Sequence, residues 1–352
     1  RSSAASDVYK RQKQQQAFFM TQNLNNAFNA QPAENAEQPE ELLIPIDISR
    51  CYGNNKQRAV HIINTVAKNS PLGRELLENV AKEGYQIAMF GACGWGGMVS
   101  ESTKILSLNC CFSDNQLMQI IGHEARHVQQ FTNGIDSDCN HYTFKGAVMS
   151  HRAKEADAEA ASCAVCYEMK QNGVDGPWKE FEADVPLIAK GFMAACKDEK
   201  APVTHKMLQG GFEGWYQNEE MVLRYEYGYL RDGGLNYSWD ERNHPETYYI
   251  KPVTSRQIVE TVCRDPAGKC YWSDNPDVLE QPEKLAITES TLKKCRQAFM
   301  IRKNGFNLEE DKTYQTLPLR EELKAQKQKP ANSNSSMPAA AVARLMAARR
   351  GR

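Results

Sequence analysis

The sequence predicts an α+β fold in which a small sheet accompanies a larger set of helices. Two apolar runs, 85–90 and 104–108, have the length of short buried strands. Apolar residues recur at helical spacing over 59–82, 114–131 and 145–170, and Asn-Gly pairs follow the last two segments. The rest of the chain toward the C-terminus is mainly helical in pattern, so we expect helices to predominate.

Composition bounds the class of protein. The chain has 352 residues, of which 41% are hydrophobic and 25% charged, which is enough apolar material for a real core. Lys and Arg total 43 against 44 Asp and Glu, so the net charge of -1 gives no general attraction to nucleic acid or to an anionic membrane. No run of about 18 apolar residues occurs, which excludes a membrane-spanning helix.

The eleven cysteines show no clear disulfide framework. Cys163 and Cys166 form a CxxC pair, but no second pair follows at the distance found in zinc ribbons. We therefore expect free thiols in a reducing compartment, the cytoplasm. A periplasmic or secreted location stays open because the native N-terminus can be missing.

The two ends differ from the middle. Residues 2–12, SSAASDVYKRQ, resemble the in-frame translation of a sequencing-library adapter, so we expect 1–19 to be an adapter-derived or non-native leader. Residues 20–41 have the composition of a flexible leader. We expect a first domain over 42–200, an aromatic-rich, mainly helical lobe over 201–315, and a disordered tail over 316–352.

Several boundaries are predicted from local signals. Ser70-Pro71 breaks the first helical pattern, and Asp114 is a suitable N-cap for the helix that follows the strands. The glycine run 91–97 lacks the spacing of a phosphate-binding loop, so it predicts a hairpin turn. Further helices are predicted over 178–197 and 288–303.

The segment with the clearest chemistry contains HExxH, with His123, Glu124 and His127. Because the two histidines are four residues apart on a predicted helix, both imidazoles lie on one face and can bind the same metal ion. Imidazole is a good zinc ligand, and a glutamate beside the pair can accept a proton from water. On a helical wheel the histidines lie at the border of the apolar stripe, and the remaining side carries Gln119, Arg126, Gln129 and Gln130. The alternative is a pair of histidines hydrogen-bonded within a core.

A tetrahedral zinc site needs a third protein ligand. The metzincin continuation HExxHxxGxxH is absent, since Gln130 and Asn133 occupy its positions. His141 and His151 are near enough in the chain, but the best candidate is Glu155 on the next predicted helix. Glu159 lies four residues later on the same face and can bond a ligating histidine, whereas Asp157 points about 200° away. We rank Glu155 first, Glu159 second and Asp157 third. The alternative is an acidic, solvated helix face.

These two motifs resemble the gluzincin-like zincin metallopeptidases, in which HExxH is followed by ExxA[DEN] on a second helix. The combination GHEARHVQQ and EADAEA also resembles an uncharacterised bacterial family of metallopeptidase domains. The resemblance covers roughly residues 42 to 200. Glu159 departs from the pattern of many relatives, which have Asp or Asn at that position.

The resemblance implies a zincin-like core with an edge strand before the active-site helix, and 103–108 is then that strand. It implies Zn²⁺ held by His123, His127 and Glu155, and a peptide or protein substrate. Glu124 is then general base for the metal-activated water and proton donor to the leaving amine. The oxyanion partner is a Tyr or His in this group, and four residues remain candidates: Tyr142, His141, His205 and His244.

Three functions are consistent with the sequence. The first is zinc-dependent peptide-bond hydrolysis, by an endopeptidase or an aminopeptidase. The second is a binding or regulatory module that keeps the zincin fold without turnover, although the intact Glu124 argues against it. The third is a non-peptidase zinc hydrolase, because the same chemistry attacks other carbonyls.

Overall fold

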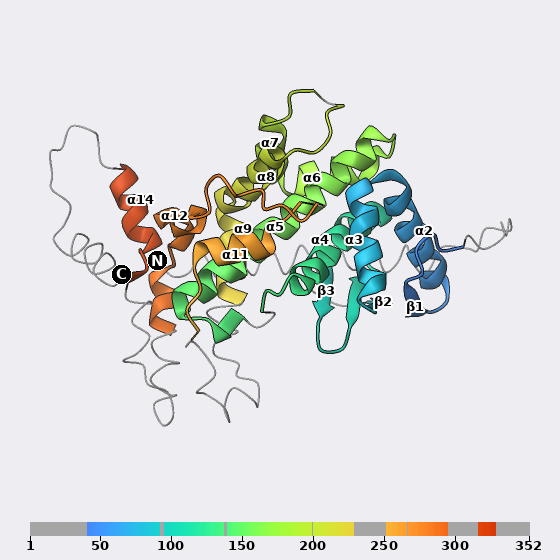
Figure 1. The fold of residues 1–352 in the computed structure, drawn as a ribbon, viewed down its shortest axis with the longest axis horizontal. Helices are drawn as coiled ribbons and strands as arrows, with labels where there is room; N and C mark the ends of the chain where they lie inside the picture. The colour runs from blue at the N-terminus through green and yellow to red at the C-terminus, as the bar shows by residue number, and fades with distance from the viewer. Residues whose placement is uncertain are drawn as a thin grey trace. The chain divides into compact units, whose positions relative to one another are not determined.

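A computed structural model describes residues 41–91, 95–136, 139–198, 200–228, 251–265, 267–294 and 316–328 (Figure 1). The fold is α+β, as the sequence predicts. The chain divides into two compact units. The first comprises the chain up to Gln129 together with Ala161–Asp184, and the second comprises Gln130–Ala160 together with the chain from Val185 on. Helices α4 (Asp114–Thr132) and α5 (Phe144–Gln171) contribute residues to both.

The first unit contains a mixed four-stranded sheet of order β1-β2-β4-β3. β1 pairs with β2 and β2 with β4 in parallel, whereas β3 pairs with β4 in antiparallel fashion. The predicted strands 85–90 and 104–108 are confirmed as β2 and β4. The strands span β1 (Asp47–Arg50), β2 (Gln86–Phe90), β3 (Gly97–Ser100) and β4 (Ile105–Asn109).

Two expectations about this sheet are wrong. The segment 103–108 is not an edge strand, because β4 lies between β2 and β3. The glycine run 91–97 is not a hairpin turn between β2 and β4, which run parallel, and its last glycine begins the edge strand β3. Strand β3 is short and starts with a glycine, so it carries almost no strand signal in the sequence.

The predicted break at Ser70-Pro71 separates α2 (Asn54–Asn69) from α3 (Pro71–Lys82). Ser70 caps α3, since its Oγ accepts a hydrogen bond of 2.8 Å from the Gly73 backbone N–H, and proline suits the first turn. Apolar residues at helical spacing on both helices are fully buried: Ile62, Ile63, Val66, Leu76 and Val80.

Glu168 of α5 fixes the start of α3. Its Oε2 accepts hydrogen bonds from the Ser70 hydroxyl at 2.5 Å and from the Leu72 backbone N–H at 2.9 Å. Burial raises the pKa of Glu168, and the two hydrogen bonds oppose that shift in part. A helix N-terminus leaves backbone N–H groups without partners, so this carboxyl satisfies a donor that packing would otherwise leave unpaired.

The N-cap of helix α4 lies one residue before the predicted Asp114. Ser113 is the cap, because its Oγ accepts from the Gln116 N–H at 3.1 Å while the Gln116 side chain accepts from the Ser113 N–H at 3.1 Å. Asp114 instead pairs with Arg58 of α2. Most of the helix's polar side is also buried, with Gln119, Arg126 and Gln130 each less than a tenth exposed.

The second unit holds a close helix pair, α7 (Pro186–Ala194) and α8 (His205–Gln217). A Cβ atom at Gly191 would lie 2.2 Å from the Gly210 carbonyl oxygen, and one at Gly214 would lie 2.4 Å from the Leu187 oxygen. These glycines therefore allow the two backbones to touch. Proline at 186 separates α7 from α6 (Asp175–Asp184), so the helix predicted over 178–197 is two helices.

A buried ion pair between Arg152 and Glu226 connects α5 to the C-terminal part of the second unit. Arg152 contacts Glu226 at 2.8 Å, and its other guanidinium N–H groups donate to the backbone oxygens of Lys284 and Ala286. Glu226 also accepts from the Thr288 backbone N–H at 2.9 Å. The remaining elements described here are η1 (Cys139–His141), α9 (Glu219–Tyr225), α11 (Ser255–Val262), η4 (Val278–Glu280), α12 (Pro282–Leu285) and α14 (Arg320–Gln328).

Helix α14 lies inside the segment 316–352, for which the sequence predicts a disordered tail. The helix predicted over 288–303 is helical over 289–294, and the rest lies outside the described residues. Nine cysteines lie in the described part of the chain; no disulfide joins any two of them, and five are buried. Among the helices described, none has both the length and the apolar character needed to cross a membrane.

Replacement of Glu168 tests its role at the start of α3. We expect Glu168→Ala to lower the free energy of unfolding by about 1–3 kcal/mol, because a buried N–H and hydroxyl lose their acceptor. Glu168→Gln keeps one acceptor oxygen for both donors, so we expect a loss of less than about 1 kcal/mol. Urea unfolding of the three proteins measures both values, and equal losses in the two variants would contradict this assignment.

The difference in stability between wild type and Glu168→Gln is expected to depend on pH. Because burial raises the pKa of Glu168, the folded protein binds this proton more tightly than the unfolded chain does. That contribution to stability is present at low pH and is lost as the pH rises through the folded-state pKa. Glutamine does not titrate, so we expect the stability of Glu168→Gln relative to wild type to rise as the pH increases through the raised pKa of Glu168.

Candidate metal centre

Helix α4 presents its two motif histidines to the same point. The Nε2 atoms of His123 and His127 lie 3.1 Å apart, and the rings meet edge to face with centroids 4.8 Å apart. Their separation of four residues places them on one helical face, as predicted. Both side chains are half-buried.

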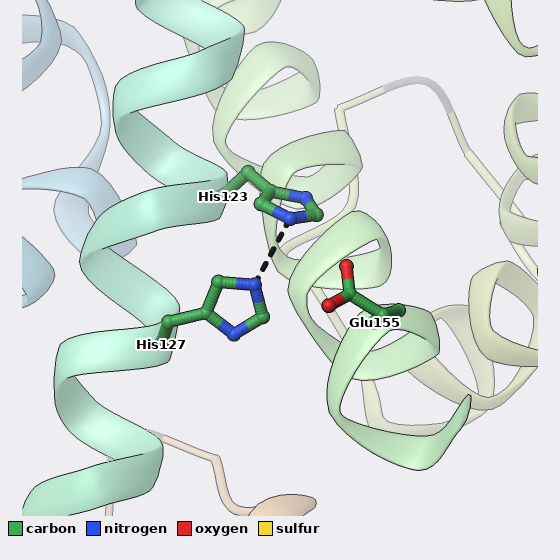
Figure 2. A group of neighbouring side chains, drawn as sticks. All are labelled: His123, His127 and Glu155. Carbon is green, nitrogen blue, oxygen red and sulfur yellow. Dashed lines mark hydrogen bonds between the residues drawn. The ribbon is translucent and has the colours of Figure 1, made fainter. Parts of the chain in front are cut away.

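Glu155 completes the group from helix α5. Each of His123, His127 and Glu155 offers one ligand atom, and these three atoms all lie within 4.8 Å of one another. Figure 2 shows the two imidazoles and the carboxylate turned toward a common point. Glu155 is only 6% exposed. The alternative of a solvated acidic face is therefore wrong for this residue, and it is also wrong for Asp157, which is 1% exposed.

Helices α4 and α5 run antiparallel. Ser162 of α5 donates to the Gln119 backbone oxygen at 2.9 Å, while Gln130, eleven residues later on α4, bonds Asp157 at 2.6 Å. A Cβ atom at Gly122 would lie 3.5 Å from Val165, so the helices are closely packed beside His123. The histidines thus lie on α4 between two cross-helix hydrogen bonds.

Glu124 is buried against the edge strand. It is 7% exposed, and a Cβ atom at Gly97 of β3 would lie 2.7 Å from the Glu124 Cγ and 2.8 Å from its Oε1. Such distances are shorter than real Cβ contacts, so only glycine leaves room for this side chain. Gly97, which ends the run 91–97, therefore allows β3 to approach the motif helix α4 closely.

The other predicted candidates lie outside the group. Within the described residues, the His/Cys/Asp/Glu group that can hold a metal includes neither His141, His151, Asp157 nor Glu159. The Nδ1 of His141 contacts Asp136 at 2.8 Å, and the Nε2 of His205 contacts Asp265 at 2.6 Å. Tyr142 is 4% exposed, and His244 lies outside the described residues.

A buried cation accompanies Glu155. Lys154 is 6% exposed, and although burial opposes it, the negative charges of Cys139 and Glu155 raise the pKa of this lysine. The pKa of Cys139 shifts in the opposite direction. Burial raises the pKa of this thiol, but His151 and Lys154 outweigh burial and lower it to about 6. This pairing is not predictable from the sequence, because the residues are separated in the chain and match no motif.

The comparisons with known proteins give one match. The family model described as "Putative metallopeptidase family (DUF6782)" matches residues 44–272, more than half of the chain. The matched segment includes the motif helix α4, all of α5 and residues 263–272 after α11. No curated protein and no solved structure matches significantly.

The contact between Gly97 and Glu124 is open to a direct test. We expect Gly97→Ala to lower the free energy of unfolding by about 1–3 kcal/mol, because the new methyl overlaps Glu124 and Ile120. Gly91→Ala is the matched control, since its Cβ would lie 3.9 Å from the nearest sulfur atoms, an ordinary contact. Urea unfolding compares the two, and a similar small change in both would contradict the close approach.

Proposed function

The chain belongs to the metallopeptidase family whose model it matches, and on that premise we propose that it hydrolyses peptide bonds with one zinc ion held by His123, His127 and Glu155. The convergence of these three side chains carries the proposal. Two come from one turn of α4 and the third from α5, 28 residues further along the chain than His127. A chance cluster of exposed acids does not fit, because Glu155 is buried.

The donor set fits zinc. Two imidazole nitrogens at about 2.0–2.1 Å from one tetrahedral zinc ion are about 3.3 Å apart, and the Nε2 atoms of His123 and His127 are 3.1 Å apart. Two histidines and one glutamate are a ligand set of catalytic zinc sites, which keep a fourth position open. When bound, zinc supplies a Lewis acid that makes water more acidic and polarises a carbonyl group.

Glu124 is the proposed general base. It follows His123 directly on α4, so the motif fixes it beside the metal ligands. Its carboxylate accepts a proton from the attacking water and returns that proton to the leaving amine. Packing of the Glu124 side chain against Gly97 restricts its rotamers, which holds the carboxylate ready for this transfer.

The proposed peptide site is the outer edge of β3, in place of the segment 103–108 that the sequence suggested. Strand β3 is an edge strand and adjoins Glu124 through Gly97. An edge strand offers backbone N–H and C=O groups to an extended peptide. Trp95 and Met98, at 53% and 40% exposure, offer apolar surface to substrate side chains. With Glu159 bonding a ligating histidine, this arrangement constitutes the zincin-like, gluzincin-type core that we propose.

Zinc content tests the metal site. We expect the full chain to bind one zinc ion, and His127→Ala or Glu155→Ala to weaken binding at least about 100-fold, more than the loss typical of residues outside the coordination sphere. Elemental analysis and chelator competition measure this. His61→Ala, an exposed histidine on α2, is the matched control and retains the wild-type affinity. A folded wild-type protein without zinc affinity would overturn the proposal.

Hydrolysis of a quenched fluorescent casein tests the base. We expect Glu124→Gln to retain zinc and to lose about 10²–10⁴-fold in rate, because the proton acceptor is gone. Glu260→Gln, a half-exposed glutamate on α11, is the control that keeps full activity. Zinc binding without cleavage of casein or of an ester by wild type would favour the regulatory module, and ester cleavage alone would favour a non-peptidase hydrolase.

A further inference from the structure

Asp157 lies at the centre of a buried polar network that joins three segments of the chain. Its Oδ2 accepts a hydrogen bond of 2.6 Å from the Gln130 side chain on α4, and its Oδ1 accepts one of 2.7 Å from the Tyr271 hydroxyl after α11. The Nε2 of Gln130 also donates to the Lys154 backbone oxygen at 3.0 Å. All three side chains are at most 1% exposed.

The network is adjacent to the metal ligands on both helices. Gln130 lies three residues after His127, which is one turn of α4. Lys154 and Asp157 flank Glu155 on α5, one residue before it and two after it. The single amide of Gln130 thus holds the very turn of α5 that carries the third ligand.

We propose that Gln130, Asp157 and Tyr271 are positioning residues that set the register of α5 against α4 and hold Glu155 opposite the two histidines. The inference rests on the proposed function, since it assigns these residues a role at the zinc site. It also gives Asp157 a role other than that of third-choice ligand.

Directional hydrogen bonds are needed here because apolar packing alone discriminates poorly between alternative registers of α5 against α4. Helix α5 is buried along most of its length, and many of its buried residues are alanines: Ala153, Ala156, Ala158, Ala160, Ala161 and Ala164. Methyl groups of equal size allow a helix to slide or rotate with little loss of contact. Buried polar groups that must find their partners penalise such shifts, and fixing register is the best-attested use of buried polar pairs.

Zinc affinity measured by chelator competition on the full chain tests the network. Gln130→Met replaces the amide with an apolar side chain of similar size, and Tyr271→Phe removes only the hydroxyl. We expect either change to weaken zinc binding about 10–100-fold, as loss of residues that orient ligands does. Asn64→Leu is the matched control, because Asn64 is another buried amide with two hydrogen bonds, on α2. It destabilises the fold and leaves zinc affinity unchanged.

A double-mutant cycle separates positioning from general stability. If Gln130 acts through Glu155, Gln130→Met has no further effect on zinc affinity once Glu155→Ala has removed the ligand. A loss of equal size in both backgrounds would mean that Gln130 acts only on the fold, and would overturn the proposal.

A conservative replacement of Asp157 is expected to preserve zinc binding. In Asp157→Asn the amide oxygen still accepts from Gln130, and the Tyr271 hydroxyl can turn to accept from the new NH₂ group. We therefore expect Asp157→Asn to bind zinc within a few-fold of wild type, and Asp157→Leu to bind about 10–100-fold more weakly.

The outcomes distinguish failure of the positioning role from failure of the proposed zinc site. If wild type shows no Glu155-dependent zinc binding, the proposed function is overturned and this inference with it. If wild type binds zinc through Glu155, and folded Gln130→Met and Tyr271→Phe bind it equally well, the positioning role alone is overturned.

Discussion

The antiparallel pairing of α4 and α5 is the constraint on which the candidate site depends. HExxH places two candidate ligands on one helix through local geometry alone, but the third side chain comes from a helix that starts after a connection. Its position is therefore set by packing and hydrogen bonding between helices. The bonds at Ser162 and at Gln130, with close contact at Gly122, hold the pair at both ends of the motif.

The sequence predicts what local periodicity determines. The histidines, the two long helices and the break at Ser70-Pro71 follow from spacing and capping rules, and each has a counterpart in the structure. The ranking of Glu155 above Asp157 also followed from helix geometry, because side chains two residues apart point to opposite sides. The group of three ligand atoms includes the first and not the second.

What the sequence did not predict depends on contacts between distant residues. Gly97 reads locally as a turn residue, yet its missing side chain makes room for Glu124 and lets a short edge strand lie against α4. Gln119 and Gln130 read as the solvent side of a helix, yet both are buried and bonded to partners 58 and 27 residues away. Glycine and glutamine have weak preferences, so their roles appear only when the partner is known.

The distribution of burial around the candidate centre has a physical logic. The two histidines are half-buried, whereas Glu155 and the groups that hold its helix are buried. This difference leaves the histidines partly accessible to water while the side of Glu155 stays rigid, because buried hydrogen bonds break only at a cost of about 1–3 kcal/mol each. Rigidity matters more for the carboxylate than for the histidines, since only the carboxylate depends on a second helix for its position. The hydrogen bonds from Gln130 to α5 therefore lie where local geometry gives the least guidance.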